Sequence, residues 1–174
     1  MMRIDLHMHS TVSDGTDAPS ELLERIREAD IEVFALTDHD AIKGCTTVRN
    51  LLRPCDPIFI NGVEFSCRDE EGKYHILGYN YDPDNASILD VVELGHRYRE
   101  KKLMARLEYI RKRFGFSFSE ADVRNLQALD NPGKPHIGNL MVRYGYAPSK
   151  DVAIRKYLNQ ARFPNEYVRP EQAI

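Results

Sequence analysis

Hydrophobic and polar residues alternate at the start of the chain. Across residues 3–9, apolar side chains occupy one set of alternate positions, and Asp5, His7 and His9 occupy the other. Because successive side chains of a strand point to opposite faces, this pattern predicts a strand with one polar face. That face carries two imidazoles two positions apart, which makes it a candidate site for chemistry.

The next segments have apolar runs at helix and strand spacing. Residues 19–29 place leucine and isoleucine at helical intervals, and Pro19 suits the first turn of a helix. Residues 31–37 are almost continuously apolar, which is typical of a parallel strand covered on both faces. A short helix at about residues 42–52 and a strand at about residues 58–64 complete a predicted βαβαβ order.

The rest of the chain is predicted to be a hairpin followed by helices. Residues 65–81 contain two strand-like runs around an acidic turn. A long helix is predicted from a cap at Ser87 to about Phe114. A second helix follows Ser119, whose side chain can form a capping box with Asp122. Two further short helices are predicted at residues 137–144 and 150–160.

These patterns predict an α/β fold with an inserted helical subdomain. No strand pattern occurs between about residues 86 and 160. The last residues resemble a short strand followed by a helix that has only begun at Pro170, and a helix of one turn cannot sustain itself. We therefore expect the domain to continue past the end of this chain. The predicted parts are residues 1–85 of the α/β domain, the helical insertion 86–162, and an incomplete return to the α/β domain at 163–174.

The composition is that of a globular protein. Of the 174 residues, 42% are hydrophobic and 29% are charged, and the net charge is −3, which argues against disorder and gives no overall attraction to nucleic acid. The lack of a long apolar run or a signal-peptide pattern predicts a cytoplasmic protein with no membrane contact. Cys45, Cys55 and Cys67 have no paired spacing, so we expect buried, reduced thiols.

Histidines and carboxylates gather at the predicted strand ends. His7 and His9 can chelate one ion, with Asp5 behind them as an orienting group. Asp14 follows that strand, and His39 follows the second strand. The third strand ends in Glu64, and the hairpin carries His75. Because the ends of successive parallel strands converge at one mouth, a shared metal site is predicted. Taken singly, Asp14 before a glycine also fits a turn, and His75 also fits an ordinary polar residue.

Mixed imidazole and carboxylate ligands favour Mn²⁺, Fe²⁺ or Zn²⁺ over Mg²⁺ or Ca²⁺. The candidate ligands exceed the needs of one ion, and Glu64 is the best placed to bridge neighbouring ions. Such a cluster would activate water for an in-line displacement at phosphorus. The sequence has no nucleophilic Ser or Cys elbow and no Gly-rich phosphate loop, so hydrolysis by activated water is the expected mechanism.

These motifs resemble those of the polymerase and histidinol phosphatase (PHP) domain family of metal-dependent phosphoesterases. The corresponding segments are DLHMHS at residues 5–10 with SDG at 13–15, TDHD at 37–40, GVE at 62–64, and YHILGY at 74–79. The resemblance implies the N-terminal part of a distorted (β/α)7 barrel with up to three divalent metal ions. It also implies that Glu64 bridges ions. The implied metal ligands are His7, His9, Asp14, His39, Glu64 and His75, of which all but His75 are also expected to be catalytic.

The helical insertion is similar to that of the family branch that acts on nucleotides. The similar segments are GKPHI at residues 133–137 and RKYL at residues 155–158. The implied substrates are phosphorylated small molecules, 3′,5′-nucleoside bisphosphates and the 5′ ends of short RNA or DNA. We expect Lys134, His136 and Arg155 to contact phosphate-like anions between the metal cluster and the insertion, since a helix start offers free backbone N–H groups.

The end of the chain departs from the family pattern. In the family, a His-Pro motif and an Asp-x-His motif supply further ligands after the point where this chain stops. We therefore expect a truncated form with an incomplete site and an activity well below that of a longer version. An incomplete barrel would also leave strand edges exposed, which predicts self-association between copies.

Two other functions stay open on the sequence alone. A metal-dependent amidohydrolase also begins with a His-x-His pair, although the TDHD motif and the lack of an obvious bridging lysine weigh against it. A non-catalytic metal- or nucleic-acid-binding fragment is suggested by the basic excess between residues 97 and 113. The simpler interpretation of that excess is the solvated face of a long helix.

Overall fold

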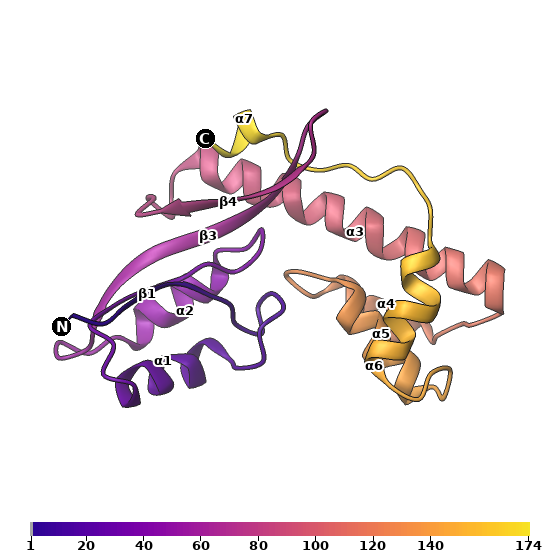
Figure 1. Cartoon of the computed structure of the whole chain (residues 1–174), viewed down its shortest axis with the longest axis horizontal. Helices are drawn as coiled ribbons and strands as arrows, with labels where there is room; N and C mark the ends of the chain where they lie inside the picture. Colours follow the sequence, from indigo (N-terminus) through magenta and orange to yellow (C-terminus); the bar gives the residue numbers. More distant parts are fainter. Residues whose placement is uncertain (1) are drawn as a thin grey trace. The chain divides into compact units, whose positions relative to one another are not determined.

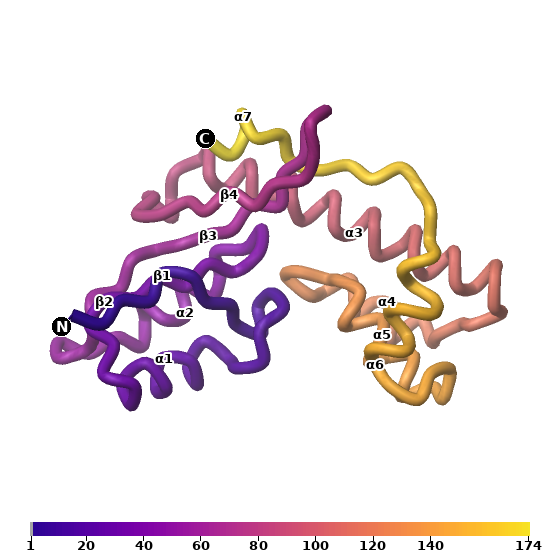
Figure 2. The backbone as a smooth tube through the Cα atoms, in the orientation of Figure 1, coloured from indigo at the N-terminus to yellow at the C-terminus, as the bar shows by residue number. Residues whose placement is uncertain are grey.

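The computed structural model describes residues 2–174 of the chain. The chain divides into two compact units. The α/β unit consists of Met1–His96 together with Tyr167–Ile174, and the helical unit is Arg97–Glu166. Figure 2 traces the path of the chain through both units.

A sheet of four strands forms the centre of the α/β unit. The strands β1 (Ile4–Met8), β2 (Val33–Leu36), β3 (Ile58–Arg68) and β4 (Lys73–Tyr79) lie side by side in sequence order. The first three are parallel, and β3 and β4 form an antiparallel hairpin. Figure 1 shows β3 as the long curved strand of this sheet. The predicted βαβαβ order and hairpin are confirmed, with residues 65–68 continuing β3.

Two helices cover the sheet, and their apolar residues form its core. The helices are α1 (Pro19–Glu28) and α2 (Lys43–Leu51), which lie along the same side of the sheet in Figure 1. Helix α1 buries Leu23 and Ile26 against Phe34 of β2. Burial of such aliphatic and aromatic side chains stabilises the unit by roughly 1.5–3 kcal/mol each. This packing fixes the carboxyl ends of β1 and β2, where the candidate ligands lie.

The alternating apolar face of β1 is only partly covered, because Met8 packs against this core whereas Ile4 and Leu6 do not. Ile4 is 50% exposed and Leu6 is 36% exposed. Among residues 2–174, β1 is an edge strand of the sheet and pairs with β2 alone. Edge strands with apolar side chains favour pairing with another chain. Self-association of this protein stays a prediction.

An ion pair connects α1 to the loop before β3. The guanidinium of Arg27 donates to both carboxylate oxygens of Asp56, at 2.7 and 2.5 Å. The hydrogen bond from Arg27 lowers the pKa of Asp56 to about 2. A carboxylate whose pKa is lowered by folding stabilises the folded state at pH values above its ordinary pKa. That stabilisation is lost as the pH falls toward the pKa of the folded state.

We expect Asp56→Asn to lower the melting temperature at pH 7. Because the contribution of Asp56 depends on its charge, the difference from the unchanged protein should shrink as pH falls from about 4 to about 2. Thermal unfolding followed by circular dichroism measures both values. Asp30→Asn, at an exposed turn position, is the control and should change little. An equal effect of Asp56→Asn at pH 7 and at pH 2.5 would contradict the role of the ion pair.

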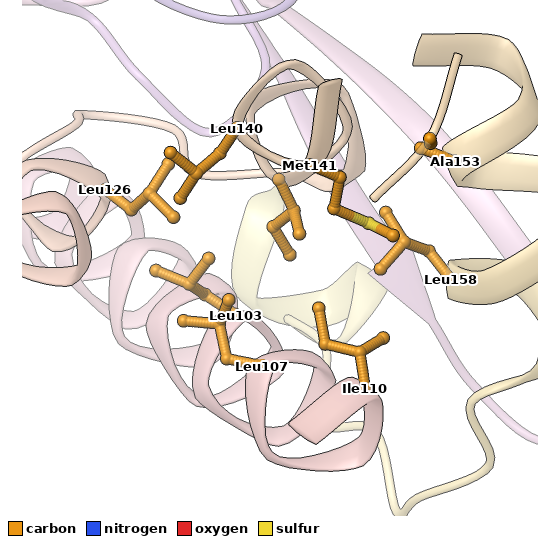
Figure 3. Close-up of a cluster of buried hydrophobic side chains, with 10 residues drawn as sticks. Leu103, Leu107, Ile110, Leu126, Leu140, Met141, Ala153 and Leu158 are labelled. Carbon is orange, nitrogen blue, oxygen red and sulfur yellow. The ribbon is translucent and has the colours of Figure 1, made fainter. Parts of the chain in front are cut away.

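The helical unit is built around the second half of α3 (Ala86–Phe114). It also contains α4 (Glu120–Gln127), α5 (Lys134–Arg143), the short α6 (Lys150–Val152), the π-helical turn η1 (Ala153–Tyr157) and the 3-10 turn η2 (Leu158–Gln160). Figure 3 shows Leu103, Leu107 and Ile110 of α3 pointing toward Leu140 and Met141. No strand occurs among residues 97–166, as predicted.

The ends of these helices differ in detail from the sequence predictions. Helix α3 begins at Ala86, and the Asn85 side chain accepts the backbone N–H of Ser87, so Ser87 is not the cap. Ser119 caps α4 by accepting the Asp122 N–H at 3.1 Å, as predicted. A capping box also requires the Asp122 side chain to accept the backbone N–H of Ser119. That bond is absent, because the Ser119 N–H donates to the Tyr144 hydroxyl instead.

Two of the three cysteines are buried, and the last residues of the chain return to the sheet. Cys45 and Cys67 are buried and unpaired, as predicted, whereas Cys55 is exposed, because it lies in the polar loop between α2 and β3. Val168 forms a parallel bridge to Cys67, and α7 (Pro170–Ala173) follows. Within residues 2–174, none of the helices has the length and apolar character that crossing a membrane requires.

Candidate metal centre

The six predicted ligands all lie in the α/β unit, either on its strands or in the segments that directly follow them. His7 belongs to β1, and His9 and Asp14 follow in the next loop. The remaining ligands come from the three other strands. His39 follows β2, Glu64 lies in the middle of β3, and His75 lies on β4. This placement follows from the parallel order of β1 to β3 and from the hairpin that brings β4 beside Glu64.

The carboxylate of Glu64 is the point at which the histidines meet. Its Oε2 lies 2.9 Å from His7 Nε2 and 3.1 Å from His9 Nε2. The same oxygen lies 3.6 Å from His39 Nδ1, and Oε1 lies 2.6 Å from His75 Nδ1. The two oxygens of one buried carboxylate therefore face different imidazoles.

The surroundings of Glu64 favour its charged form. Burial raises the pKa of the carboxyl, but the hydrogen bond with His7 and the nearby His39 and His75 outweigh burial and hold the pKa below its ordinary value. An ionised carboxylate is the form that binds a cation. Glu64 is thus charged at neutral pH in a position surrounded by nitrogen donors.

Asp14 and His39 extend the cluster on the other side of His9. Asp14 lies 3.7 Å from His9 Nδ1 and 3.9 Å from His39 Nε2. The ring centroids of His9 and His39 are 4.6 Å apart, and those of His39 and His75 are 4.9 Å apart. The imidazoles therefore form a continuous group, with a carboxylate at each side of His9.

Three overlapping groups of side chains have the spacing needed to hold a metal ion. In each group the donor atoms lie within 4.8 Å of one another. Glu64 belongs to two of the groups, which fits the predicted bridging role. Imidazole and carboxylate donors are the set that Mn²⁺, Fe²⁺ and Zn²⁺ accept. The groups are His7, His9 and Glu64; His9, Asp14 and His39; and His39, Glu64 and His75.

The first ligand loop is held by Asp38, which sequence reasoning did not single out. Asp38 is 1% exposed and accepts three hydrogen bonds of 2.7 Å, from the Ser10 N–H, the Ser10 hydroxyl and the Ser13 hydroxyl. These serines lie between His9 and Asp14 in the loop that carries both ligands. The sequence did contain a hint of this role. Neighbouring side chains of an extended segment point to opposite sides, so Asp38 is expected to point away from the side that His39 occupies.

The backbone also connects the segment that follows β2 to the middle of β3. The Glu64 N–H donates to the Asp38 carbonyl at 3.2 Å, and the Asp40 N–H donates to the Glu64 carbonyl at 3.0 Å. Asp40 is buried, has a positive φ of 49°, and accepts the Ser66 N–H through its side chain at 2.8 Å. These bonds fix the spacing between His39 and Glu64.

Asp5 has a smaller role than the sequence suggested. Its carboxylate accepts the backbone N–H of His7 at 3.2 Å. Residues two apart in the chain are close enough for such a bond, and the bond orders the main chain at His7. The predicted orienting contact of Asp5 is therefore with the backbone of a ligand residue.

The three predicted substrate contacts lie in the helical unit. The Nδ1 of His136 accepts the Gly133 N–H at 3.1 Å, and the Lys134 ammonium donates to Asn159 Oδ1 at 2.7 Å. Arg155 is exposed on η1. Lys134 and His136 thus stabilise the start of α5 and its neighbour η2, and the role of all three residues in binding anions stays a prediction.

We expect the protein to bind transition-metal ions without further treatment. Elemental analysis after purification without a chelator should find between a fraction of one and about two such ions per chain. Soaking in Mn²⁺ or Zn²⁺ should raise the content. Absence of bound metal after soaking would contradict the assignment of the three groups.

Known proteins resemble this chain over nearly all of its length. A 5′-3′ exoribonuclease of Haemophilus influenzae is 29% identical over 98% of this chain, and the match covers 61% of that protein. A 3′,5′-nucleoside bisphosphate phosphatase of Chromobacterium violaceum is 29% identical over 93% of this chain, and the match covers 57% of that protein. The chain therefore spans about three fifths of the length of these curated relatives.

Two solved structures share the fold. A candidate metal-dependent phosphoesterase of Bifidobacterium adolescentis superposes on 99% of this chain with a TM-score of 0.83 at 22% identity. A protein of Chromobacterium violaceum described as an amidohydrolase, solved with bound sulfate and no metal, superposes on 99% with a TM-score of 0.82 at 24% identity. Each match covers 62% of the other chain.

The fold is consequently that of part of a PHP barrel, as the motifs predicted. The family model for the PHP domain matches residues 5–161, which include every ligand of the three groups and most of the helical unit. The chain belongs to the PHP domain family.

Proposed function

We propose that this chain is the metal-binding part of a phosphoesterase that hydrolyses phosphate esters of nucleotides or short oligonucleotides. The observation that carries the proposal is the convergence of four histidines on the single carboxylate of Glu64, with Asp14 beside them. Three overlapping donor groups are suited to more than one divalent ion. The named activities of the two curated relatives, on RNA and on nucleoside bisphosphates, support the substrate class.

The residues of the cluster would hold the ions, and the rest of the site would keep them in place. When bound, divalent ions polarise a phosphoryl oxygen, make water more acidic and neutralise the charge that develops during displacement at phosphorus. Glu64 supplies a negative charge between the groups, and its two oxygens face separate imidazoles. Asp38 keeps the loop of His9 and Asp14 in position through Ser10 and Ser13.

We further propose that Lys134, His136 and Arg155 bind the phosphate groups of the substrate. A lysine, a histidine and an arginine at or near the start of α5 and on η1 are suited to an anion, and backbone N–H groups at a helix start add to that attraction. The prediction is that His136→Ala weakens phosphate or nucleotide binding severalfold in isothermal titration. Unchanged affinity would contradict this role for His136.

Hydrolysis assays with several ester classes test the main proposal. The full chain, loaded with Mn²⁺, is incubated with a 5′-phosphorylated RNA oligonucleotide, a 3′,5′-nucleoside bisphosphate and a panel of amides. We expect release of phosphate or nucleotide from the first two substrates, inhibition by a chelator and no cleavage of the amides. Chelator-sensitive amide cleavage would instead favour an amidohydrolase, and no cleavage of any substrate by the metal-loaded chain would favour a non-catalytic metal-binding fragment.

A further inference from the structure

The charges of the chain are divided unevenly between its two units. The helical unit, Arg97–Glu166, contains 15 Lys and Arg residues against 7 Asp and Glu residues, which gives a formal charge of +8. The α/β unit contains 9 against 20, a formal charge of −11. The overall charge of −3 is therefore the sum of a strongly cationic unit and a strongly anionic unit. A cationic unit of this kind attracts polyanions in a salt-dependent way.

Several basic side chains of the helical unit form ion pairs with carboxylates. Lys112 pairs with Glu108 at 2.8 Å, and Lys101 pairs with Glu166 at 2.6 Å. Arg113 and Lys156 differ, because both are exposed and neither has a carboxylate partner among residues 2–174. Both cations lie against aromatic rings, so their charge remains available to a ligand.

Arg113 and Lys156 are held beside one aromatic pair. The Arg113 guanidinium carbon lies 5.8 Å from the centre of the Phe114 ring, and the Lys156 ammonium lies 5.5 Å from the centre of the Tyr157 ring. The rings of Phe114 and Tyr157 meet edge to face, with their centres 5.0 Å apart. Both rings are half-buried. We name these four residues the cationic aromatic surface.

The backbone at this surface is unusual. Lys156 and Tyr157 lie on the π-helical turn η1, between α6 and η2. Such turns are rare and often occur at functional sites, because the wider turn redirects side chains that a regular helix would place elsewhere. Arg155, also exposed, lies on the same turn. The turn and the aromatic pair thus share Tyr157.

We propose that the cationic aromatic surface binds single-stranded RNA, with phosphates on the cations and a base against the aromatic pair. Sites for single strands combine basic side chains with aromatic rings, and stacking on the rings is tolerant of sequence. The conclusion that the bound strand is the substrate rests on the proposed phosphoesterase function. On that basis the preferred substrates are oligonucleotides that extend beyond a single nucleotide.

The test measures binding of a short fluorescein-labelled oligouridine by fluorescence anisotropy over a series of salt concentrations. The full chain is used in the presence of EDTA, so that binding is measured without metal and without hydrolysis. The test variant is Arg113→Gln/Lys156→Gln. The matched control is Arg49→Gln/Arg53→Gln, which removes two exposed charges from the α/β unit. Melting curves from circular dichroism establish that each variant is folded.

We expect the unchanged chain to bind the oligouridine with an affinity that falls as salt rises. Each phosphate contact with a single strand contributes about 0.7 to the magnitude of the slope of log K against log salt. The test variant removes two such contacts, so its slope should be smaller by about 1.4, whereas the slope of the control should hardly change. Should the test variant unfold, Arg155→Gln provides a second measurement with an expected loss of about 0.7. Arg113→Lys keeps the charge and should retain the slope.

Three results would overturn the proposal. The first is no oligouridine binding at low salt, and the second is an equal loss of slope in the test and control variants. The third is that vesicles containing phosphatidylserine bind as strongly as the oligouridine and that the test variant weakens this vesicle binding. That result would assign the surface to a membrane. Failure of hydrolysis with RNA binding intact would instead remove the proposed function and leave the binding surface in place.

Discussion

Replacing Glu64 with glutamine should remove most of the affinity for metal and, with it, any metal-dependent hydrolysis. The amide has nearly the same size as the carboxylate, but it has no negative charge and presents only one oxygen to the imidazoles. Glu64 is only 3% exposed and lies within 3.6 Å of four histidine nitrogens. Loss of a supporting residue around a metal site already costs about 10–100-fold in affinity, so loss of this shared ligand should cost at least about 100-fold.

Competition with a chromophoric chelator measures the metal affinity of Glu64→Gln directly, and a hydrolysis assay on 5′-phosphorylated RNA measures the activity. Glu71→Gln, in the exposed turn of the β3–β4 hairpin, is the matched control. The control should bind metal like the unchanged chain. Metal affinity of Glu64→Gln within about threefold of the control would show that the carboxylate is not a ligand.

Replacing Asp38 with alanine should affect both stability and metal binding, although Asp38 is not one of the donor residues. The change leaves the Ser10 N–H and the hydroxyls of Ser10 and Ser13 without their acceptor in a buried place. Each unsatisfied buried donor costs about 1–3 kcal/mol, so the free energy of unfolding should fall by roughly 3 kcal/mol or more. Metal affinity should fall by about 10–100-fold, because the loop of His9 and Asp14 loses its anchor.

Denaturant unfolding in EDTA and chelator competition separate the two effects of Asp38→Ala. The conservative variant Asp38→Asn keeps one acceptor oxygen and should show an intermediate result in both measurements. If Asp38→Ala lowered stability but left the metal affinity unchanged, the hydrogen bonds would serve folding alone and the positioning role would be wrong.

The sequence predicted the ligand cluster well because strand geometry determines it. Alternation on β1 places His7 and His9 on one face, and parallel pairing brings His39 and Glu64 to the same edge. These relations depend only on the period of a strand and on the order of the strands. His75 was the weakest ligand prediction, because only the hairpin register places Ser66 opposite His75 and so brings its ring to Glu64.

The features that the sequence did not predict depend on packing between distant elements. Asp38 is a buried acceptor for a loop that lies 25 to 28 residues earlier, and no local pattern specifies that contact. The π-helical turn at η1 was predicted as regular helix, since its residues have ordinary helical spacing. The exposure of Ile4 and Leu6 was also not predicted, because alternation shows that a strand has two faces without showing which one is covered.

The backbone bonds between residues 38, 40 and 64 affect how quickly this region opens to solvent. The amide hydrogens of Glu64 and Asp40 are held in bonds between β3 and the segment that follows β2, next to the buried residues Leu36 and Val63. Exchange of such hydrogens for deuterium requires the strands to separate, which is a rare event in a packed sheet. The spacing of His39 and Glu64 should therefore persist without metal, and uptake of an ion should change deuterium exchange mainly in the loop of residues 10–15.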